Sequence, residues 1–221
     1  MVPPSVRLER RLIKEGYERI AGVDEAGRGP LAGPVVAAAV MLPHDIHIKG
    51  LKDSKKLSPK KREKLYKEIF KKAKSVGIGV IGEGKIDEVN IHQASFIAMK
   101  VAIKSLSPSP DIVLVDGRHK IPAMNISQKA IVGGDDIVSS IAAASIIAKV
   151  TRDAIMLDLA KKYPGWGFAR HKGYGTAEHI RLLKKKGPLP IHRKTFMSLL
   201  REEDTLELFE HRFYNAKGGV K

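Results

Sequence analysis

Four acidic residues of this sequence stand where secondary structure elements are expected to end or begin. Asp24 and Glu25 close an apolar run, Asp116 ends the run "IVLVD", and Asp135 directly precedes a long helical pattern. Strand ends of an open α/β sheet meet at its ligand crevice, so we expect these carboxylates to converge. Converging carboxylates repel one another unless they share cations. The pattern therefore predicts a site for two divalent ions held by oxygen ligands, a chemistry used to cleave phosphodiesters.

Each of the later acids also has a purely structural explanation. Asp116 precedes Gly117, as a turn-forming residue does, and either Asp135 or Asp136 is a suitable N-cap for the following helix. The sequence alone does not separate the roles of Asp135 and Asp136.

The adjacent pair Asp24 and Glu25 imposes a geometric condition. Successive residues of a regular strand point to opposite faces, so both acids reach one site only if one of two conditions is met. Either the strand breaks at this point, or one of the two contributes a backbone carbonyl. Gly27 and Gly29 provide a place for such a break.

Strand and helix patterns alternate along the chain, which predicts an α/β fold. Ser58 and Pro59 mark one helix start, as N-cap and first helical residue. The first two strands are separated only by a glycine-rich loop, so they are predicted to pair antiparallel. The expected strands are 19–26, 34–42, 77–84, 111–117 and 125–131, and the expected helices are 5–14, 59–73, 90–106, 137–161, 176–186 and 196–211.

The composition favours a partner of negative charge. Forty Lys and Arg against 24 Asp and Glu leave a formal charge of +16, which attracts polyanions such as nucleic acid. The chain has no cysteine, so any metal is expected on oxygen or imidazole ligands. No apolar run approaches the length of about 20 residues that spans a membrane, and the N-terminus lacks a signal-peptide core, so a cytoplasmic location is expected.

The sequence resembles ribonuclease HII of the bacterial type over nearly its whole length, roughly 19–196. The motifs that carry the resemblance are "GVDEAGRGPLAGPV", "LKDSKKLSPKKREKL", "IVLVDG", "GGDD", "SIAAASIIAKVTRD", "HKGYGT" and "LPIHR". The resemblance implies an RNase H-like fold, with a mixed central sheet flanked by helices and a C-terminal helical subdomain. We expect a catalytic domain over 1–162 and a substrate-binding part over 163–221, because the composition changes after Tyr163.

The resemblance also implies an activity. This is Mg²⁺- or Mn²⁺-dependent hydrolysis of RNA in RNA/DNA hybrids by two metal ions. It includes cleavage on the 5′ side of a single ribonucleotide embedded in duplex DNA, leaving a 3′-hydroxyl and a 5′-phosphate. A monomer is expected.

The resemblance assigns roles to individual residues. It gives the metal ions to Asp24, Glu25, Asp116 and Asp135, and the ribose 2′-hydroxyl to the backbone of Gly27, Arg28 and Gly29. Tyr174 is expected to stack on a sugar. The residues expected to contact the duplex backbone are Lys55, Ser145, Lys149, His171, Lys172, His192 and Arg193.

Some alternatives stay open at this point. Arg152 is interpreted as a helix-surface charge, and His192 is a weaker hypothesis for a general base. The competing functions are ribonuclease HIII, a resolvase-type DNA nuclease and a non-catalytic basic nucleic-acid-binding protein. Gly27, Arg28 and Gly29 argue against a DNA-only substrate, and the full acid set argues against a pure binding protein.

Overall fold

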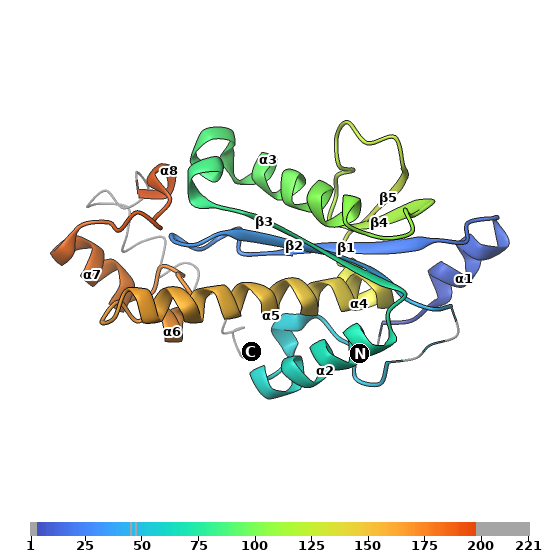
Figure 1. Cartoon of the computed structure of the whole chain (residues 1–221), viewed down its shortest axis with the longest axis horizontal. Helices are drawn as coiled ribbons and strands as arrows, with labels where there is room; N and C mark the ends of the chain where they lie inside the picture. The colour runs from blue at the N-terminus through green and yellow to red at the C-terminus, as the bar shows by residue number, and fades with distance from the viewer. Residues whose placement is uncertain (1–3, 45, 47, 198–221) are drawn as a thin grey trace, which may run out of the picture.

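A mixed five-stranded sheet runs through the centre of the molecule (Figure 1). The structure is a computed structural model that describes residues 4–44, 46 and 48–197. The strand order is β3-β2-β1-β4-β5, with β1 parallel to β4 and antiparallel to β2. The strands are β1 (Ile20–Ala26), β2 (Val35–Met41), β3 (Ser75–Ile81), β4 (Ile112–Asp116) and β5 (Ser127–Ile131).

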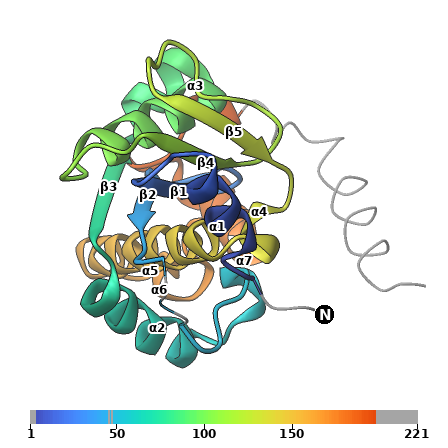
Figure 2. The same cartoon turned by 90° about the vertical axis from the view of Figure 1, so that its right-hand side faces the viewer.

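Helices cover both faces of this sheet. Figures 1 and 2 show α3 on one face, and α2 and α5 on the other. The helices are α1 (Arg7–Lys14), α2 (Pro59–Lys72), α3 (Glu83–Lys104), α4 (Gly134–Ile137), α5 (Ser139–Lys162), α6 (Phe168–His171), α7 (Ala177–Lys186) and α8 (Lys194–Met197), with a 3₁₀ helix η1 (Ser54–Lys56). The predicted α/β class and the antiparallel pairing of β1 with β2 are confirmed.

Alternation along the strands creates two apolar layers. Ala37 and Ala39 of β2 pack in the layer toward α3, whereas Ala38 and Val40 pack toward α2 and α5. Period-two alternation sends neighbouring side chains to opposite faces, so a continuous apolar strand fills both layers. The same alternation sends Gly22 of β1 against the start of α5.

Several helix boundaries differ from the expected ones because single residues cap or break them. Helix α3 begins at Glu83, and its expected start at Asn90 is a kink with φ of 66°. The Asn90 side chain accepts a hydrogen bond from the Gln93 N–H (3.1 Å), which is a capping contact inside the merged helix. The expected single helix from 137 is divided, because Val138 is extended between α4 and α5.

The C-terminal part shares a core with the rest of the chain. Phe168 and Leu183 pack with Leu31, Ala32 and Met156 in one apolar cluster. Helix α7 begins one residue after its expected start, because Thr176 is its N-cap and accepts a hydrogen bond from the His179 N–H. Helix α6 was not expected. The expected helix 196–211 lies outside the described residues beyond Met197, and the division at residue 163 stays a prediction.

Within the described part of the chain, no helix combines the length and apolar character needed to cross a bilayer.

Candidate active site

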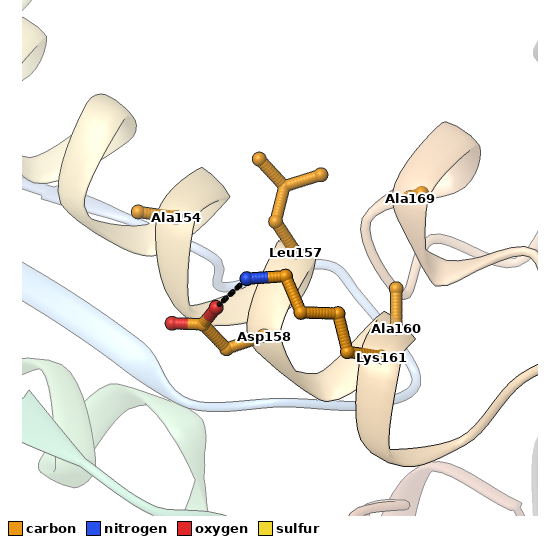
Figure 3. A pocket seen from close by; sticks show the side chains of 6 residues that line it. All are labelled: Ala154, Leu157, Asp158, Ala160, Lys161 and Ala169. Carbon is orange, nitrogen blue, oxygen red and sulfur yellow. Dashed lines mark hydrogen bonds and ion pairs between the residues drawn. The ribbon is translucent and has the colours of Figure 1, made fainter.

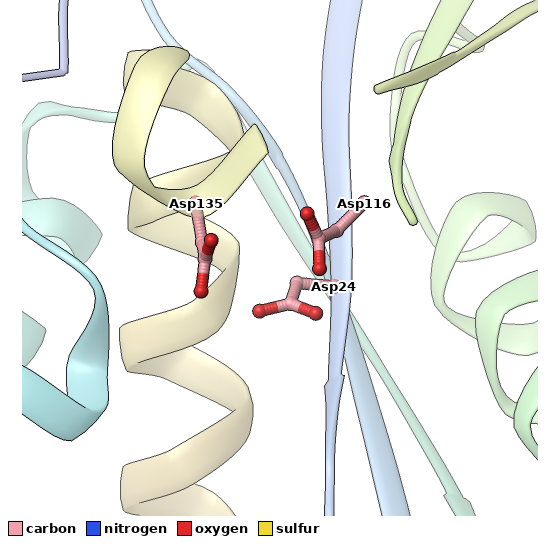
Figure 4. A group of neighbouring side chains, drawn as sticks. All are labelled: Asp24, Asp116 and Asp135. Atoms are coloured by element: carbon pink, nitrogen blue, oxygen red, sulfur yellow. The ribbon is translucent and has the colours of Figure 1, made fainter. Parts of the chain in front are cut away.

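Three carboxylates from three elements meet at the end of β1. Asp24 of β1, Asp116 of β4 and Asp135 of α4 each offer an oxygen, and these oxygens lie within 4.8 Å of one another (Figure 4). The parallel register explains the first two, because Val23 pairs with Val115 and the next residue on each strand is an aspartate. The expected convergence of acids at the strand ends is therefore present in the fold.

The turn before α4 brings the third carboxylate into place. The Gly134 N–H donates to Oδ1 of Asp116 at 2.7 Å, which ties the turn to the end of β4. Gly133 has φ of 64°, in the left-handed region that favours glycine. A Cβ on Gly134 would lie 2.6 Å from Ile141 Cδ1 and 3.3 Å from that carboxylate oxygen, so the close approach requires glycine.

Burial and mutual repulsion disfavour negative charge in this cluster. Desolvation, then the charges of Glu25 and Asp116, raise the pKa of Asp24 well above its usual value. Desolvation and the charge of Asp116 raise the pKa of Asp135 to about 6. Desolvation also raises the pKa of Asp116, although the Gly134 N–H opposes this shift. The cationic side chains of the protein therefore do not fully neutralise the negative charge of these carboxylates.

The donor set fits a divalent cation. Its members are hard oxygen ligands, and Asp24 and Asp135 are almost fully buried. The nearest ammonium is Lys55 Nζ, 3.9 Å from Asp135 Oδ2, on a side chain that is 80% exposed. A bound cation would stabilise the charged forms of these carboxylates, which burial and mutual repulsion disfavour.

Glu25 does not join the three aspartates. Strand β1 continues regularly to Ala26, which pairs with Val36, so of the two alternatives for this pair the strand break is absent. Glu25 instead accepts a hydrogen bond from Arg28 Nη1 at 3.1 Å. Desolvation raises the pKa of Glu25, and the Arg28 charge opposes the rise. Its carboxylate therefore stands beside the cluster rather than inside it.

The structure separates Asp135 from Asp136. Asp135 is buried with the other two carboxylates, whereas Asp136 is ion-paired with Lys56. The carboxylate next to the glycine pair is thus the one in the cluster.

The glycine-rich loop that follows β1 and the segment that carries Tyr174 lie side by side. Arg28 and Gly29 are exposed, while Gly27 is buried. A Cβ on Gly29 would meet Tyr174 Cε1 at 4.0 Å, and the Tyr174 side chain is 42% exposed. The Leu31 N–H donates to the Gly173 carbonyl at 2.8 Å, which holds the two segments together.

Two of the expected duplex contacts, Ser145 and Lys149, lie on α5 and make different contacts. Ser145 is buried, and its hydroxyl is 2.9 Å from that of Ser54, so it fixes η1 to α5 rather than facing a duplex. This contact helps to fix the position of Lys55, the next residue of η1, near Asp135. Lys149 pairs with Asp153 at 2.8 Å and lies 5.8 Å from the Tyr174 ring centre.

The basic set expected in the C-terminal part requires correction. His171, His192 and Arg193 are buried and hydrogen-bonded to protein groups, so their side chains are not placed to hold phosphates. His192 bonds His179 and the Leu189 backbone, which also argues against a role as general base. Only Lys172 of this set is partly exposed.

Sequence reasoning also missed two side chains. Arg152 was interpreted as surface charge but is fully buried and donates to three backbone carbonyls. Its i, i+4 and i+7 spacing with Ser145 and Lys149 indicated a polar helix face and gave no sign of this burial. His92 of α3 contacts Arg28 Nη2 at 3.0 Å through Nε2. No sequence pattern indicated that contact.

A surface pocket lies elsewhere on the molecule. Figure 3 shows it on α5 and α6, where Lys161 pairs with Asp158 at 2.7 Å. Its lining is mostly apolar: Ala154, Leu157, Asp158, Ala160, Lys161 and Ala169. None of the three clustered carboxylates lines it.

Comparisons with known proteins agree with this site. A family model described as ribonuclease HII matches residues 21–199. A ribonuclease HII of Acetivibrio thermocellus is 58% identical over 85% of this chain and 73% of its own length. One of Caldicellulosiruptor saccharolyticus is 55% identical over 86% of this chain and 92% of its own.

A solved structure gives the same result for the fold. The ribonuclease H2 of Pyrococcus horikoshii is 29% identical, with a TM-score of 0.68, covering 88% of this chain and 98% of its own. The RNase H-like fold and the type 2 ribonuclease H class are thereby established, in place of the competing functions. The chain belongs to the ribonuclease HII family, and its activity is endonucleolytic cleavage of the RNA strand in RNA/DNA hybrids.

Proposed function

We propose that this enzyme also cuts on the 5′ side of a single ribonucleotide embedded in duplex DNA, leaving a 3′-hydroxyl and a 5′-phosphate. The observation that carries the proposal is the close approach of the exposed Gly29 to the Tyr174 ring, in a loop that directly follows the strand of Asp24. One ribose then suffices for recognition, because the 2′-hydroxyl distinguishes RNA from DNA.

Asp24, Asp116 and Asp135 would hold the metal ions, with Glu25 completing the set by its backbone carbonyl or, once released from Arg28, by its side chain. Mg²⁺ or Mn²⁺, bound as a pair, would activate the attacking water and stabilise the leaving oxygen. The three aspartates would position these ions, and through them the scissile phosphate, relative to β1 and α4. The described histidines of the C-terminal part do not reach this cluster, so we assign no general base.

The loop and the tyrosine would divide the recognition of the substrate. The backbone of Gly27, Arg28 and Gly29 would contact the 2′-hydroxyl, since no side chain intervenes at either glycine. Tyr174, flanked by Lys149, would stack on a neighbouring sugar. Lys55, Lys149 and Lys172 would contact phosphates, in keeping with the net charge of +16. The enzyme would act as a monomer.

The test is nucleotide-resolution mapping of the products. A DNA duplex with one central ribonucleotide is incubated with Mg²⁺, with Mn²⁺ or with chelator. Matched duplexes carry a deoxyribonucleotide or a 2′-O-methyl nucleotide at that position. We expect one metal-dependent cut, 5′ to the ribonucleotide, and none in either control duplex. Cleavage of RNA/DNA hybrids without any cut at the single ribonucleotide would contradict the proposal.

A further inference from the structure

Two arginines lie in the interior of the protein without a carboxylate partner. Arg152 and Arg193 are each 0% exposed. Among the ion pairs of the described residues, none involves either one. An uncompensated buried cation is costly, and desolvation lowers the pKa of both guanidinium groups. The compensation comes from backbone carbonyl groups.

Arg193 holds the glycine-rich loop from inside. Its Nη1 donates to the Arg28 carbonyl at 3.0 Å, and its Nη2 donates to the Gly27 carbonyl at 2.6 Å. Its Nε and Nη2 both donate to the Gly33 carbonyl, at 3.0 and 2.8 Å. The rigid, five-donor fork of arginine suits such a set of carbonyls, and lysine cannot reproduce it.

Arg152 connects the same loop to the segment that carries Tyr174. Its Nε donates to the Pro34 carbonyl at 2.9 Å, and its Nη2 donates to the Ala32 carbonyl at 3.1 Å. Its Nη1 reaches across to the Lys172 carbonyl at 3.0 Å. Gly27 leaves the required space, because a Cβ there would lie 2.1 Å from Arg152 Nε.

The direction of these bonds determines what the loop presents outward. In a trans peptide the C=O and the following N–H point in opposite directions. Carbonyls of Gly27 and Arg28 that are held from inside therefore turn the N–H groups of Arg28 and Gly29 away from the Arg193 guanidinium. Both residues are exposed, and within the described part of the chain neither N–H has a protein acceptor.

We propose that Arg152 and Arg193 are positioning residues for ribonucleotide recognition. They hold the Arg28 and Gly29 N–H groups outward and fix their spacing from Tyr174. This inference rests on the proposed function of the loop, but the two arginines themselves touch no substrate. Their replacement is expected to lower the rate of cleavage rather than the affinity for the duplex, because the guanidinium groups contact no phosphate.

The test uses Arg193→Lys in the full chain, which keeps the positive charge and removes the fork. Single-turnover cleavage is measured on the duplex with one ribonucleotide and on an RNA/DNA hybrid. Duplex affinity is measured in chelator. Arg19→Lys is the chemical control, because Arg19 is an exposed arginine paired with Asp111. Ile69→Ala, in the buried α2 layer, controls for lost stability.

We expect Arg193→Lys to lower the single-turnover rate about 100-fold, the usual effect of a displacement near 1 Å. Duplex affinity and the metal concentration for half-maximal rate are expected to stay unchanged. Both control variants should keep the wild-type rate below their melting temperatures. A folded Arg193→Lys that cleaves both substrates at the wild-type rate would overturn the inference and leave the proposed function standing.

The two ideas fail in different ways. If the wild type cuts hybrids but not the single ribonucleotide, the proposed function fails, and the variants are then judged on the hybrid alone. If Arg193→Lys does not fold, Arg152→Lys makes the same test from the second arginine. A measurement on the wild type needs no variant: backbone order parameters of Arg28 and Gly29 near about 0.85 support positioning, and values below about 0.6 refute it.

Discussion

Asp24 is stabilised poorly by the protein itself. It is 5% exposed, faces two other carboxylates, and lies on the α5 side of β1. Desolvation and repulsion both act against its charged form and raise its pKa. A cluster of this kind is strained without cations and relaxed with them. Stability in the absence of metal and activity in its presence therefore place opposite demands on this residue.

We predict that Asp24→Asn raises the melting temperature in chelator, because it removes one of the repelling charges. The gain follows from the desolvation and the repulsion that both act against the charged form of Asp24 and raise its pKa. Added Mg²⁺ should raise the melting temperature of the wild type and leave that of the variant nearly unchanged. Thermal melts in both buffers test this, with Asp136→Asn as the control outside the cluster. A variant less stable than the wild type in chelator would argue against the strain.

The sequence was a good guide to the acids and a poor one to the buried cations. The positions of acids at strand ends can be predicted from the sequence, because strand and loop patterns indicate where the strand ends meet, as for Asp24 and Asp116. Asp135 and Asp136 could not be told apart, because only the local turn at Gly133 decides which one points inward. Arg193 looked like a surface cation, since no local pattern reveals carbonyls supplied by a loop 160 residues away.

At the scale of elements, the contact between β1 and α5 positions the site. A Cβ on Gly22 would lie 2.3 Å from backbone atoms of Ser140 and Ile141, so strand and helix touch through their main chains. Glu9 of α1 adds to this junction by accepting hydrogen bonds from the Ser140 N–H and hydroxyl. The helix that follows Asp135 is thereby fixed against the strand that carries Asp24.

We predict that Gly22→Ala separates this helix from β1 and lowers both stability and activity. Overpacking of this kind costs about 1–3 kcal/mol, and the displacement of Asp135 relative to Asp24 should reduce the rate further. Denaturant unfolding and single-turnover cleavage measure the two effects. Gly84→Ala is the matched control, because Gly84 lies in a helix with nothing within 4 Å of its Cβ position. Equal behaviour of the two variants would contradict the role of this contact.

A second arrangement of elements concerns three histidines around α6 and α7. His179 Nδ1 bonds the Tyr174 carbonyl at 2.9 Å, and its Nε2 lies 3.0 Å from Nε2 of His192. His171 stacks on His179 with ring centres 4.4 Å apart. Desolvation lowers the pKa of His179 to about 4 and also lowers those of the other two. These rings are therefore built into the fold as neutral groups.

We predict that this cluster destabilises the protein in acid. The unfolded chain binds a proton at His179 near pH 6.5, whereas the folded chain does so only near 4. Its contribution is thus complete above about pH 6.5 and declines as the pH falls toward 4, by up to about 3 kcal/mol. Asp135 has the opposite sign, because its raised pKa of about 6 favours the folded state as the pH falls.

The difference between wild type and His179→Gln isolates the histidine from the aspartates. Urea unfolding between about pH 7 and 4 should show a steeper loss of stability for the wild type than for the variant. His119→Gln, at an exposed position, is the control. Parallel pH profiles of wild type and His179→Gln would show that the buried ring does not titrate in this range.

Expected and observed elements differ most where a single residue redirects the backbone. The positions of the strands and long helices could be predicted from the pattern of apolar residues in the sequence. The kink at Asn90, the break at Val138 and the short helix α6 depend on individual dihedral angles and tertiary contacts. Periodicity carries no information about such positions, so these boundaries required the structure.

At the scale of the whole molecule, a protein with a strongly positive net charge carries a cluster of carboxylates at the end of its central strand. The formal charge of +16 attracts the duplex, and the carboxylates repel phosphate unless cations neutralise them. Lys55 stands close to the cluster, and Lys149 stands beside Tyr174. The lysines near the cluster, together with cations held by the carboxylates, would favour a polyanionic substrate such as an RNA/DNA hybrid.

The central claim is that the cluster of Asp24, Asp116 and Asp135 holds the catalytic divalent ions. Its most direct test is single-turnover hydrolysis of an RNA/DNA hybrid with Mg²⁺ by each Asp→Asn variant, beside Asp136→Asn. We predict a loss of at least about 100-fold for each of the three, as for the removal of one essential electrostatic group, and near wild-type rates for Asp136→Asn. Full activity in any of the three, or equal loss in Asp136→Asn, would contradict this account of the site.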